Sequence, residues 1–187
     1  MRETILVLLL SALGSIAVGF LLGTAETIIN SLPGLIVLVP PLMSIRGAIG
    51  GAFSARLSTA LHLGTIKPIL RNNTTAFKKS FFATLILTAV LPLWIGALSY
   101  LVTSLFNVGG ETHLSLLGFI LIAELSGLLS GFLQALVSIL LSIITYRRGL
   151  DPDVVVAPII YTTGDVIGVI SLVLITQLLA ISGVGLI

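Results

Sequence analysis

Three charged residues lie deep inside long apolar stretches of this sequence: Arg46, Glu124 and Asp165. A charge at the centre of a bilayer costs at least about 2.5–3.5 kcal/mol, so such residues are functional by default. Asp165 follows Val154, the start of the last apolar stretch, by 11 residues, which is roughly 17 Å along a helix. The same arithmetic puts Arg46 about 18 Å into its own stretch, and Glu124 is as deep from the opposite face. The three charges are therefore predicted at one level, near the midplane.

The simplest interpretation of these charges is a buried ion pair that orders the helices, but a pair accounts for only two of the three. If Arg46 pairs with Glu124, Asp165 is left over. An unpaired carboxylate in a low dielectric must take up a proton or bind a cation. In a dimer, two copies of each residue leave a net charge of −2, which one divalent ion would neutralise.

The residues around Asp165 can bring oxygen atoms close to its carboxylate. Pro158 removes one backbone hydrogen bond about a turn into the predicted helix. The other neighbours carry a hydroxyl or have no side chain, namely Thr162, Thr163, Gly164 and Gly168. Hard cations such as Mg²⁺ prefer oxygen ligands, and Mg²⁺ keeps most of its water, so few carboxylates suffice.

The second apolar stretch has a matching feature. Pro40 and Pro41 can break its helix, and Gly47, Gly50 and Gly51 would then expose backbone at the same depth as Asp165. The same glycines also fit close helix packing. Arg56 lies within about two turns of a membrane surface, where arginine reaches water readily, so we interpret it as an interfacial or intersubunit structural charge.

The elements that must position these residues are membrane-spanning helices. The chain has 187 residues, 57% hydrophobic and 9% charged, with a mean hydropathy of +1.23, whereas soluble domains carry about 25% charged residues. Taking about 20 apolar residues per crossing, we predict an all-α integral membrane protein with a single domain, 1–187, of five helices. The spans fall near 4–29, 34–61, 80–106, 113–146 and 154–182. The first is too long for a signal peptide and is read as a span.

The basic residues predict the orientation. In a five-span arrangement one side carries Arg2, Lys67, Arg71, Lys78, Lys79, Arg147 and Arg148, and the other side none. We expect a multi-pass protein of the cell membrane with a cytoplasmic N-terminus and an external C-terminus. The scattered basic residues argue against nucleic-acid binding. With no cysteine, no partnered nucleophile and no phosphate-binding loop, the chain is predicted not to be an enzyme.

Two motifs resemble the membrane domain of the MgtE family of magnesium transporters, especially its eukaryotic two-repeat relatives. One is Met43-Ser44-Ile45-Arg46-Gly47-Ala48 with the run Ser54-Ala55-Arg56-Leu57-Ser58-Thr59-Ala60, which is similar to the family's second helix. The other is Asp151-Pro152-Asp153, Ala157-Pro158-Ile159 and Thr163-Gly164-Asp165, which is similar to its loop and fifth helix. The order, spacing and span count agree over essentially the whole chain, as a single repeat without the soluble magnesium-sensing domains of bacterial members.

The resemblance implies a homodimeric pore that holds Mg²⁺ between two fifth helices, with Asp165 as the central metal ligand. It implies a pore-lining role for Gly47 and for Ala48, which stands where the family often has Asn, and it places Glu124 where relatives carry a polar residue. With the residue-based candidates, the predicted pore lining is Gly47, Ala48, Gly51, Glu124, Thr162, Gly164 and Gly168, and the predicted structural charges are Arg46 and Arg56.

The predicted function is therefore a homodimeric, lipid-embedded divalent-cation channel or transporter, with Mg²⁺ as the expected ion and Mn²⁺ or other divalent ions as alternatives. Two other functions stay open. One is a proton-coupled secondary transporter with Asp165 as its protonation site. The other is a membrane subunit that transports nothing.

Overall fold

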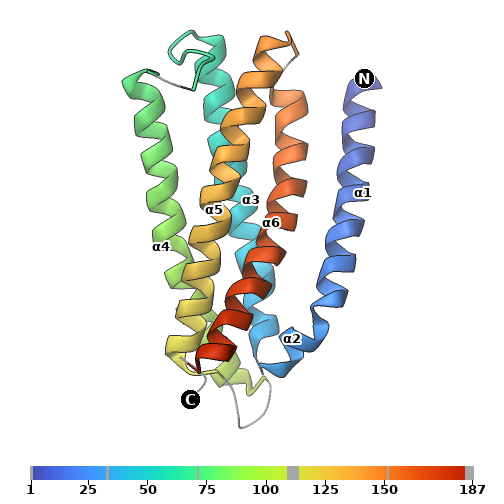
Figure 1. The fold of residues 1–187 in the computed structure, drawn as a ribbon, viewed down its shortest axis with the longest axis vertical. Coiled ribbons are helices and arrows are strands. Elements are labelled where there is room, and N and C mark those ends of the chain that lie inside the picture. The colour runs from blue at the N-terminus through green and yellow to red at the C-terminus, as the bar shows by residue number, and fades with distance from the viewer. Residues whose placement is uncertain (1, 33, 71, 109–113, 151, 184–187) are drawn as a thin grey trace.

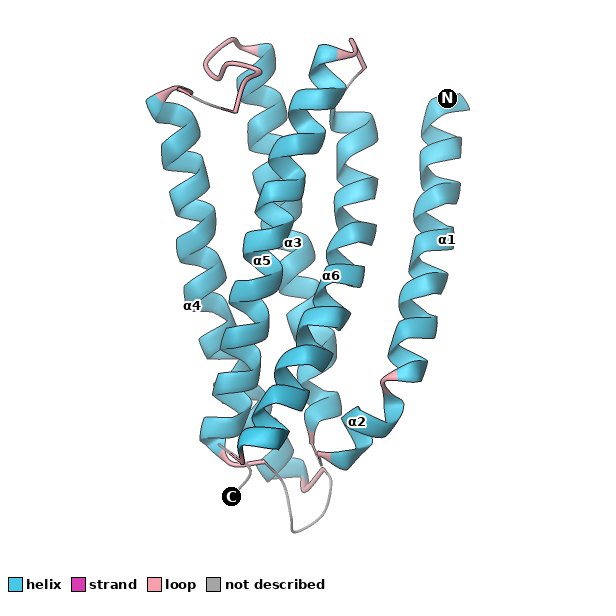
Figure 2. Cartoon of the chain, viewed as in Figure 1, coloured by secondary structure: helices cyan, strands magenta, loops and turns pink. Residues whose placement is uncertain are grey.

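All the regular secondary structure in the described part of the chain is helical. The structure is a computed structural model, and it describes residues 2–32, 34–70, 72–108, 114–150 and 152–183. Within these ranges there are six helices and no strand (Figure 2). They are α1 Arg2–Thr24, α2 Glu26–Ser31, α3 Leu35–His62, α4 Thr75–Phe106, α5 Leu116–Arg147 and α6 Pro152–Ser182.

Four of these helices contain a stretch that is long and apolar enough to cross a membrane, namely α3, α4, α5 and the part of α6 from Val155 to Ser182. Helix α1 contains a further apolar helical stretch, Ser11–Thr24, among the residues whose side chains are described. The all-α architecture is confirmed for the described residues, and four helices are long and apolar enough to be membrane spans. A fifth crossing by α1 stays a prediction.

The helices run roughly side by side as a bundle (Figure 1). Helix α5 packs against α3, α4 and α6, whereas α1 packs on α6 and α2 and does not contact α3, α4 or α5 within the described residues. Figure 1 shows α1 beginning at the same end as the α3–α4 and α5–α6 connections, and α6 ending at the opposite end. The described basic residues of these connections therefore share one end of the bundle.

Local sequence explains where several helices begin and end. The hydroxyls of Thr74 and Ser115 accept hydrogen bonds from the first-turn amides of α4 and α5, as N-caps do. Asn107 ends α4 in the left-handed conformation, at φ 52°. Gly34 precedes α3 at φ 86°, and a side chain there would meet Thr103. This turn therefore requires glycine.

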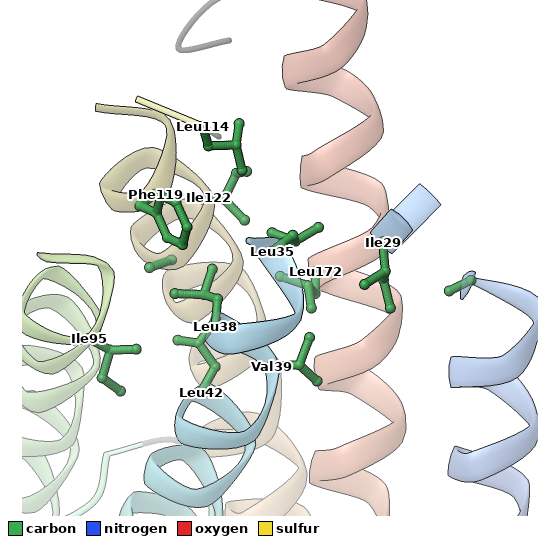
Figure 3. Packing of buried hydrophobic residues seen from close by; sticks show 12 residues of the cluster. Ile29, Leu35, Leu38, Val39, Leu42, Ile95, Leu114, Phe119, Ile122 and Leu172 are labelled. Atoms are coloured by element: carbon green, nitrogen blue, oxygen red, sulfur yellow. The ribbon is translucent and has the colours of Figure 1, made fainter. Parts of the chain in front are cut away.

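The interior contains two apolar clusters with a polar layer between them. Near the end of the bundle where α3 begins, Leu38 and Leu42 of α3 pack with Phe119 of α5 and Leu172 of α6 (Figure 3). Towards the other end, Phe53 and other large side chains of α3 pack against α5. Buried polar residues between the clusters include Arg46, Ser126, Ser130 and Gln134. The buried charge of the bundle thus lies at mid-height, between the two apolar clusters.

Two expectations about helix continuity need correction. The stretch 4–29 is not one helix, because α1 ends at Thr24 and α2 begins at Glu26, so the chain turns at Ala25 towards α3 (Figure 1). Pro40 and Pro41 do not break α3, which continues from Leu35 to His62. Both prolines lie in the first two turns, so only the carbonyls of the first turn lose their amide partners.

Glycine at position 96 permits the close approach of α4 and α5. A Cβ atom at Gly96 would lie 2.8 Å from the Cα of Ile120 and 2.9 Å from the carbonyl oxygen of Phe119. These are backbone atoms of a neighbouring helix, so they can move only if the two helices separate. By contrast, a Cβ atom at Gly19 on α1 would meet nothing within 4 Å.

We predict that Gly96→Ala lowers the free energy of unfolding by about 1–3 kcal/mol, as overpacking does. Gly19→Ala is the matched control, and it should be neutral or stabilise the protein by up to about 1 kcal/mol. Denaturant unfolding in detergent micelles measures both. Equal stabilities for the two variants would contradict the close α4–α5 contact.

Candidate functional site

Arg46 is the most buried charged side chain of the described residues, with 4% of its surface exposed. Its Nε donates to the hydroxyl of Ser130 on α5 at 2.9 Å, and its Nη1 donates to the carbonyl oxygen of Gly164 on α6 at 3.3 Å. Nη1 also lies 3.2 Å from the sulfur of Met43. Its Nη2 is buried and has no hydrogen-bond partner. One side chain of α3 thus joins α3 to both α5 and α6.

The pairing of Arg46 with Glu124 is wrong. Arg46 donates its hydrogen bonds to Ser130 and Gly164, and the buried Oε2 of Glu124 has no partner among the described residues. The acidic residue next to the backbone that Arg46 binds is Asp165, which follows Gly164 directly. The reason is the direction in which this part of α5 faces. Ile120 and Gly127, which lie one turn either side of Glu124, contact α4. Glu124 therefore lies on the side of α5 towards α4.

Asp165 lies on a face of α6 that the described helices leave partly open. Tyr161, one turn before it, packs on Gly47 and Gly51 of α3, and Thr162 packs on Gly14 of α1. Asp165 is on the same side of α6 as both residues, so it lies between α1 and α3, which do not contact each other. It is partly exposed and makes no hydrogen bond or ion pair with any described residue.

The predicted glycines lie where other side chains fill the space above them. The ring of Tyr161 covers Gly47 and Gly51, and the amide of Gln134 covers Gly164. Gly168 faces the guanidinium of Arg46, which leaves no room for a Cβ atom. Their absent side chains therefore let Tyr161, Gln134 and Arg46 enter the helix interfaces, and a role in lining a pore stays a prediction.

Thr162 connects α6 to α1. Its hydroxyl lies 2.8 Å from the hydroxyl of Ser11 and donates to the carbonyl oxygen of Pro158 at 3.0 Å. Ser11 also lies 3.5 Å from that carbonyl oxygen. Thr163, by contrast, bonds only to carbonyl oxygens of its own helix. The polar contact between α1 and α6 is therefore one turn from Asp165.

Ala48 and Arg56 share an exposed stripe of α3. The stripe runs at four-residue spacing through Pro40, Ser44, Ala48, Ala52 and Arg56, all of which are exposed. Arg56 makes no hydrogen bond or ion pair with the described residues. Ala48 and Arg56 thus face away from the bundle, on the helix that borders the open side of Asp165.

Sequence reasoning missed a polar stripe on α5. Ser126, Ser130, Gln134, Ser138 and Ser142 recur at every fourth position and are all buried. Ser130 holds Arg46, and Gln134 donates to the carbonyl oxygen of Ile160 on α6 at 3.3 Å. The four-residue spacing is visible in the sequence, but the prediction considered only the charged residues of this helix. Tyr161 and Ser11 had no comparable signal.

The described residues contain no group of three His, Cys, Asp or Glu side chains that could hold a metal ion. A cation at Asp165 would therefore find no preformed cluster of such ligands within the described part of this chain. Its other ligands must be water, neutral oxygen atoms or groups from a second copy.

The fold and the buried charges define a class. Long apolar helices that enclose ionisable residues at mid-height are typical of multi-pass membrane proteins that move ions or protons. The family model of MgtE, described as a divalent cation transporter, matches residues 39–175, which is more than half of the chain. The chain therefore belongs to the MgtE family of divalent cation transporters, a family of transporters rather than enzymes.

A curated relative agrees with this assignment. The chain is similar to rat (Rattus norvegicus) solute carrier family 41 member 3, with 27% identity over 168 residues. The alignment covers 86% of this chain but 35% of the relative. The chain thus spans about a third of the length of that protein.

The contact between Ser11 and Thr162 gives a prediction about α1. Thr162→Val and Ser11→Ala should each lower stability by about 0.5–1.5 kcal/mol, because each removes the hydrogen bond that joins the two hydroxyl groups across the helices. Their double mutant should be less destabilised than the sum by about 0.6 kcal/mol, the average for such contacts in membranes. Thr163→Val is the control, since its hydroxyl bonds only within α6. Strict additivity in unfolding measurements would contradict the contact.

The separation of Arg46 from Glu124 gives a second prediction. Because the two side chains share no partner, the destabilisations caused by Arg46→Ala and Glu124→Ala should add within about 0.5 kcal/mol. The measurement is a double-mutant cycle of unfolding free energies. If the double mutant were more stable than Arg46→Ala alone, the two residues would interact, and the absence of an ion pair between them would be contradicted.

Proposed function

We propose that this chain transports a divalent cation, Mg²⁺ first among them, through a homodimeric pore in which Asp165 of each copy binds the ion near the midplane. The observation that carries the proposal is the state of Asp165. It is a partly exposed carboxylate in the middle of an apolar span, and it has no direct partner among the described residues. Such a group is set up to bind a cation or a proton.

Family membership supports a divalent cation rather than another solute. The matched region includes Arg46, Glu124 and Asp165, and it contains α3 from Val39 and most of α6. The chemistry agrees with a hard ion, because the chain has no cysteine and offers carboxylate, hydroxyl and carbonyl oxygens near Asp165. Mg²⁺ retains water readily and so needs few protein ligands.

The open side of Asp165 supports a dimer. A second copy that covers the face between α1 and α3 would bring two Asp165 carboxylates together and place the exposed stripe of α3 at the interface. Small residues such as Ser44, Ala48 and Ala52 permit close contact between helices, and all three are exposed. Arg56 would lie in or beside this contact.

The proposed setting is the cell membrane, with lipid around the bundle. The bundle end that carries the described basic residues is proposed to face the cytoplasm, according to the positive-inside rule. The first helix would then complete five crossings and put the start of the chain on the cytoplasmic side.

Asp165→Asn tests the proposal. The purified protein is reconstituted in liposomes that contain a fluorescent Mg²⁺ indicator, and the variant should lose at least about 90% of the initial rate of uptake because the amide carries no charge for the ion. Glu26→Gln makes the same change at an exposed position outside the midplane and should retain the rate. Mn²⁺ should compete with Mg²⁺ in the wild type.

Co-reconstitution tests the dimer separately. If both carboxylates of a dimer hold the ion, equal amounts of wild type and Asp165→Asn should give about a quarter of the wild-type rate when subunits exchange, and half when each copy acts alone. Undiminished uptake by Asp165→Asn would exclude the ion site. Flux that a pH gradient drives and Mg²⁺ does not inhibit would favour proton coupling instead.

A further inference from the structure

We infer that Arg46 is a fixed positive charge that weakens the binding of a divalent cation at Asp165 and thereby speeds its release. This inference rests on the proposed function, because it assigns a second residue to the same ion site. The proposed function names the residue that binds the ion, and this inference concerns how tightly the ion is bound.

The position of the guanidinium carries the inference. Arg46 reaches from α3 to the turn of α6 that bears Asp165, where Nη1 donates to the carbonyl oxygen of Gly164 at 3.3 Å. Gly168, one turn further along, has no side chain, and the guanidinium occupies the space that a Cβ atom would need. Gly164 and Gly168 thus flank Asp165 in sequence: the first binds the guanidinium through its carbonyl oxygen, and the second leaves room for it.

The guanidinium is held there from the far side. Ser130 on α5 accepts from Nε at 2.9 Å, and the side chain is 4% exposed. Arg46 therefore cannot swing out to water as surface arginines do. When an ion arrives at Asp165, the positive charge stays.

No acidic side chain neutralises this charge directly. Among the described residues, Arg46 has no carboxylate within 4.0 Å, and its Nη2 has no hydrogen-bond partner at all. Its field therefore extends to Asp165, which it attracts. The attraction favours the empty charged carboxylate, and the same field repels an incoming cation.

Transport explains why such an arrangement is useful. An ion pathway must bind its ion well enough to admit it and weakly enough to let it leave. Carboxylates with no opposing charge in a low dielectric would bind a divalent ion tightly, because Coulomb energies there are large. A fixed guanidinium offsets part of this attraction without competing for the ion's coordination positions.

The test measures Mn²⁺ binding by electron paramagnetic resonance and Mg²⁺ flux into liposomes. Arg46→Gln should bind Mn²⁺ on the order of tenfold more tightly than wild type, and its maximal flux should fall. Arg46→Lys keeps the charge and should retain wild-type affinity. A variant that is merely less stable would lose binding rather than gain it.

A second variant serves if Arg46→Gln does not fold. Ser130→Asp places a carboxylate next to Nε of Arg46, neutralises the guanidinium in place and should tighten Mn²⁺ binding similarly. Ser130→Asn is its neutral control of nearly the same size and should leave the affinity unchanged. Because the charges are buried, the difference between the two variants should persist at 1 M salt, where the Debye length is about 3 Å.

The outcomes separate the two proposals. If Asp165→Asn binds Mn²⁺ as tightly as wild type, the ion site itself is wrong and the role of Arg46 falls with it. If Asp165→Asn loses binding but Ser130→Asp and any folded Arg46→Gln bind no more tightly than wild type, the ion site stands and the role inferred for Arg46 is overturned.

Discussion

The burial of one guanidinium at mid-height constrains how three of the helices meet. A buried charge is tolerated only when polar groups surround it, and Arg46 obtains them from a hydroxyl of α5 and a backbone carbonyl of α6. The contact at Gly168 is so close that a methyl group would displace the guanidinium. Polar contacts therefore determine where α3, α5 and α6 meet. The apolar clusters above and below bury further surface, but apolar contacts do not favour one orientation of the helices over another.

Small and hydroxyl-bearing residues serve the same purpose along the rest of the bundle. In a membrane there is little hydrophobic force between helices, so association depends on close packing and interhelical hydrogen bonds. The buried serines and Gln134 of α5 supply this at every fourth residue. Gly96 and Gly131 let α4 approach α5. Among the described residues, helix α1 makes such a connection to α6 at Ser11 and Gly14.

The sequence predicted how deep the charged residues lie in the bundle, but it did not predict which neighbouring helix each side chain meets. Counting residues from the helix starts predicted Arg46 and Asp165 at one level, and the guanidinium does bind the backbone of Gly164, the residue before Asp165. The partner of Arg46 was predicted wrongly because one charge was paired with another, whereas the guanidinium binds neutral groups, one of them in the polar stripe of α5. The turn at Ala25 is flanked by Gly23, Thr24 and Glu26, but the stretch around them was long and apolar enough to be predicted as one span.

The open side of Asp165 follows from the same geometry. Arg46, Gln134 and Tyr161 fill the faces of α6 that meet α3 and α5, and Thr162 meets α1, so the carboxylate is left on the sector between α1 and α3. A carboxylate there cannot form a direct pair with Arg46, because the guanidinium is held one face away by Ser130 and Gly164. Within one chain, the carboxylate of Asp165 therefore has no positively charged group in direct contact with it. In the proposed dimer two carboxylates would share an ion while two guanidinium groups stay behind them, and that arrangement favours passage of the ion over retention.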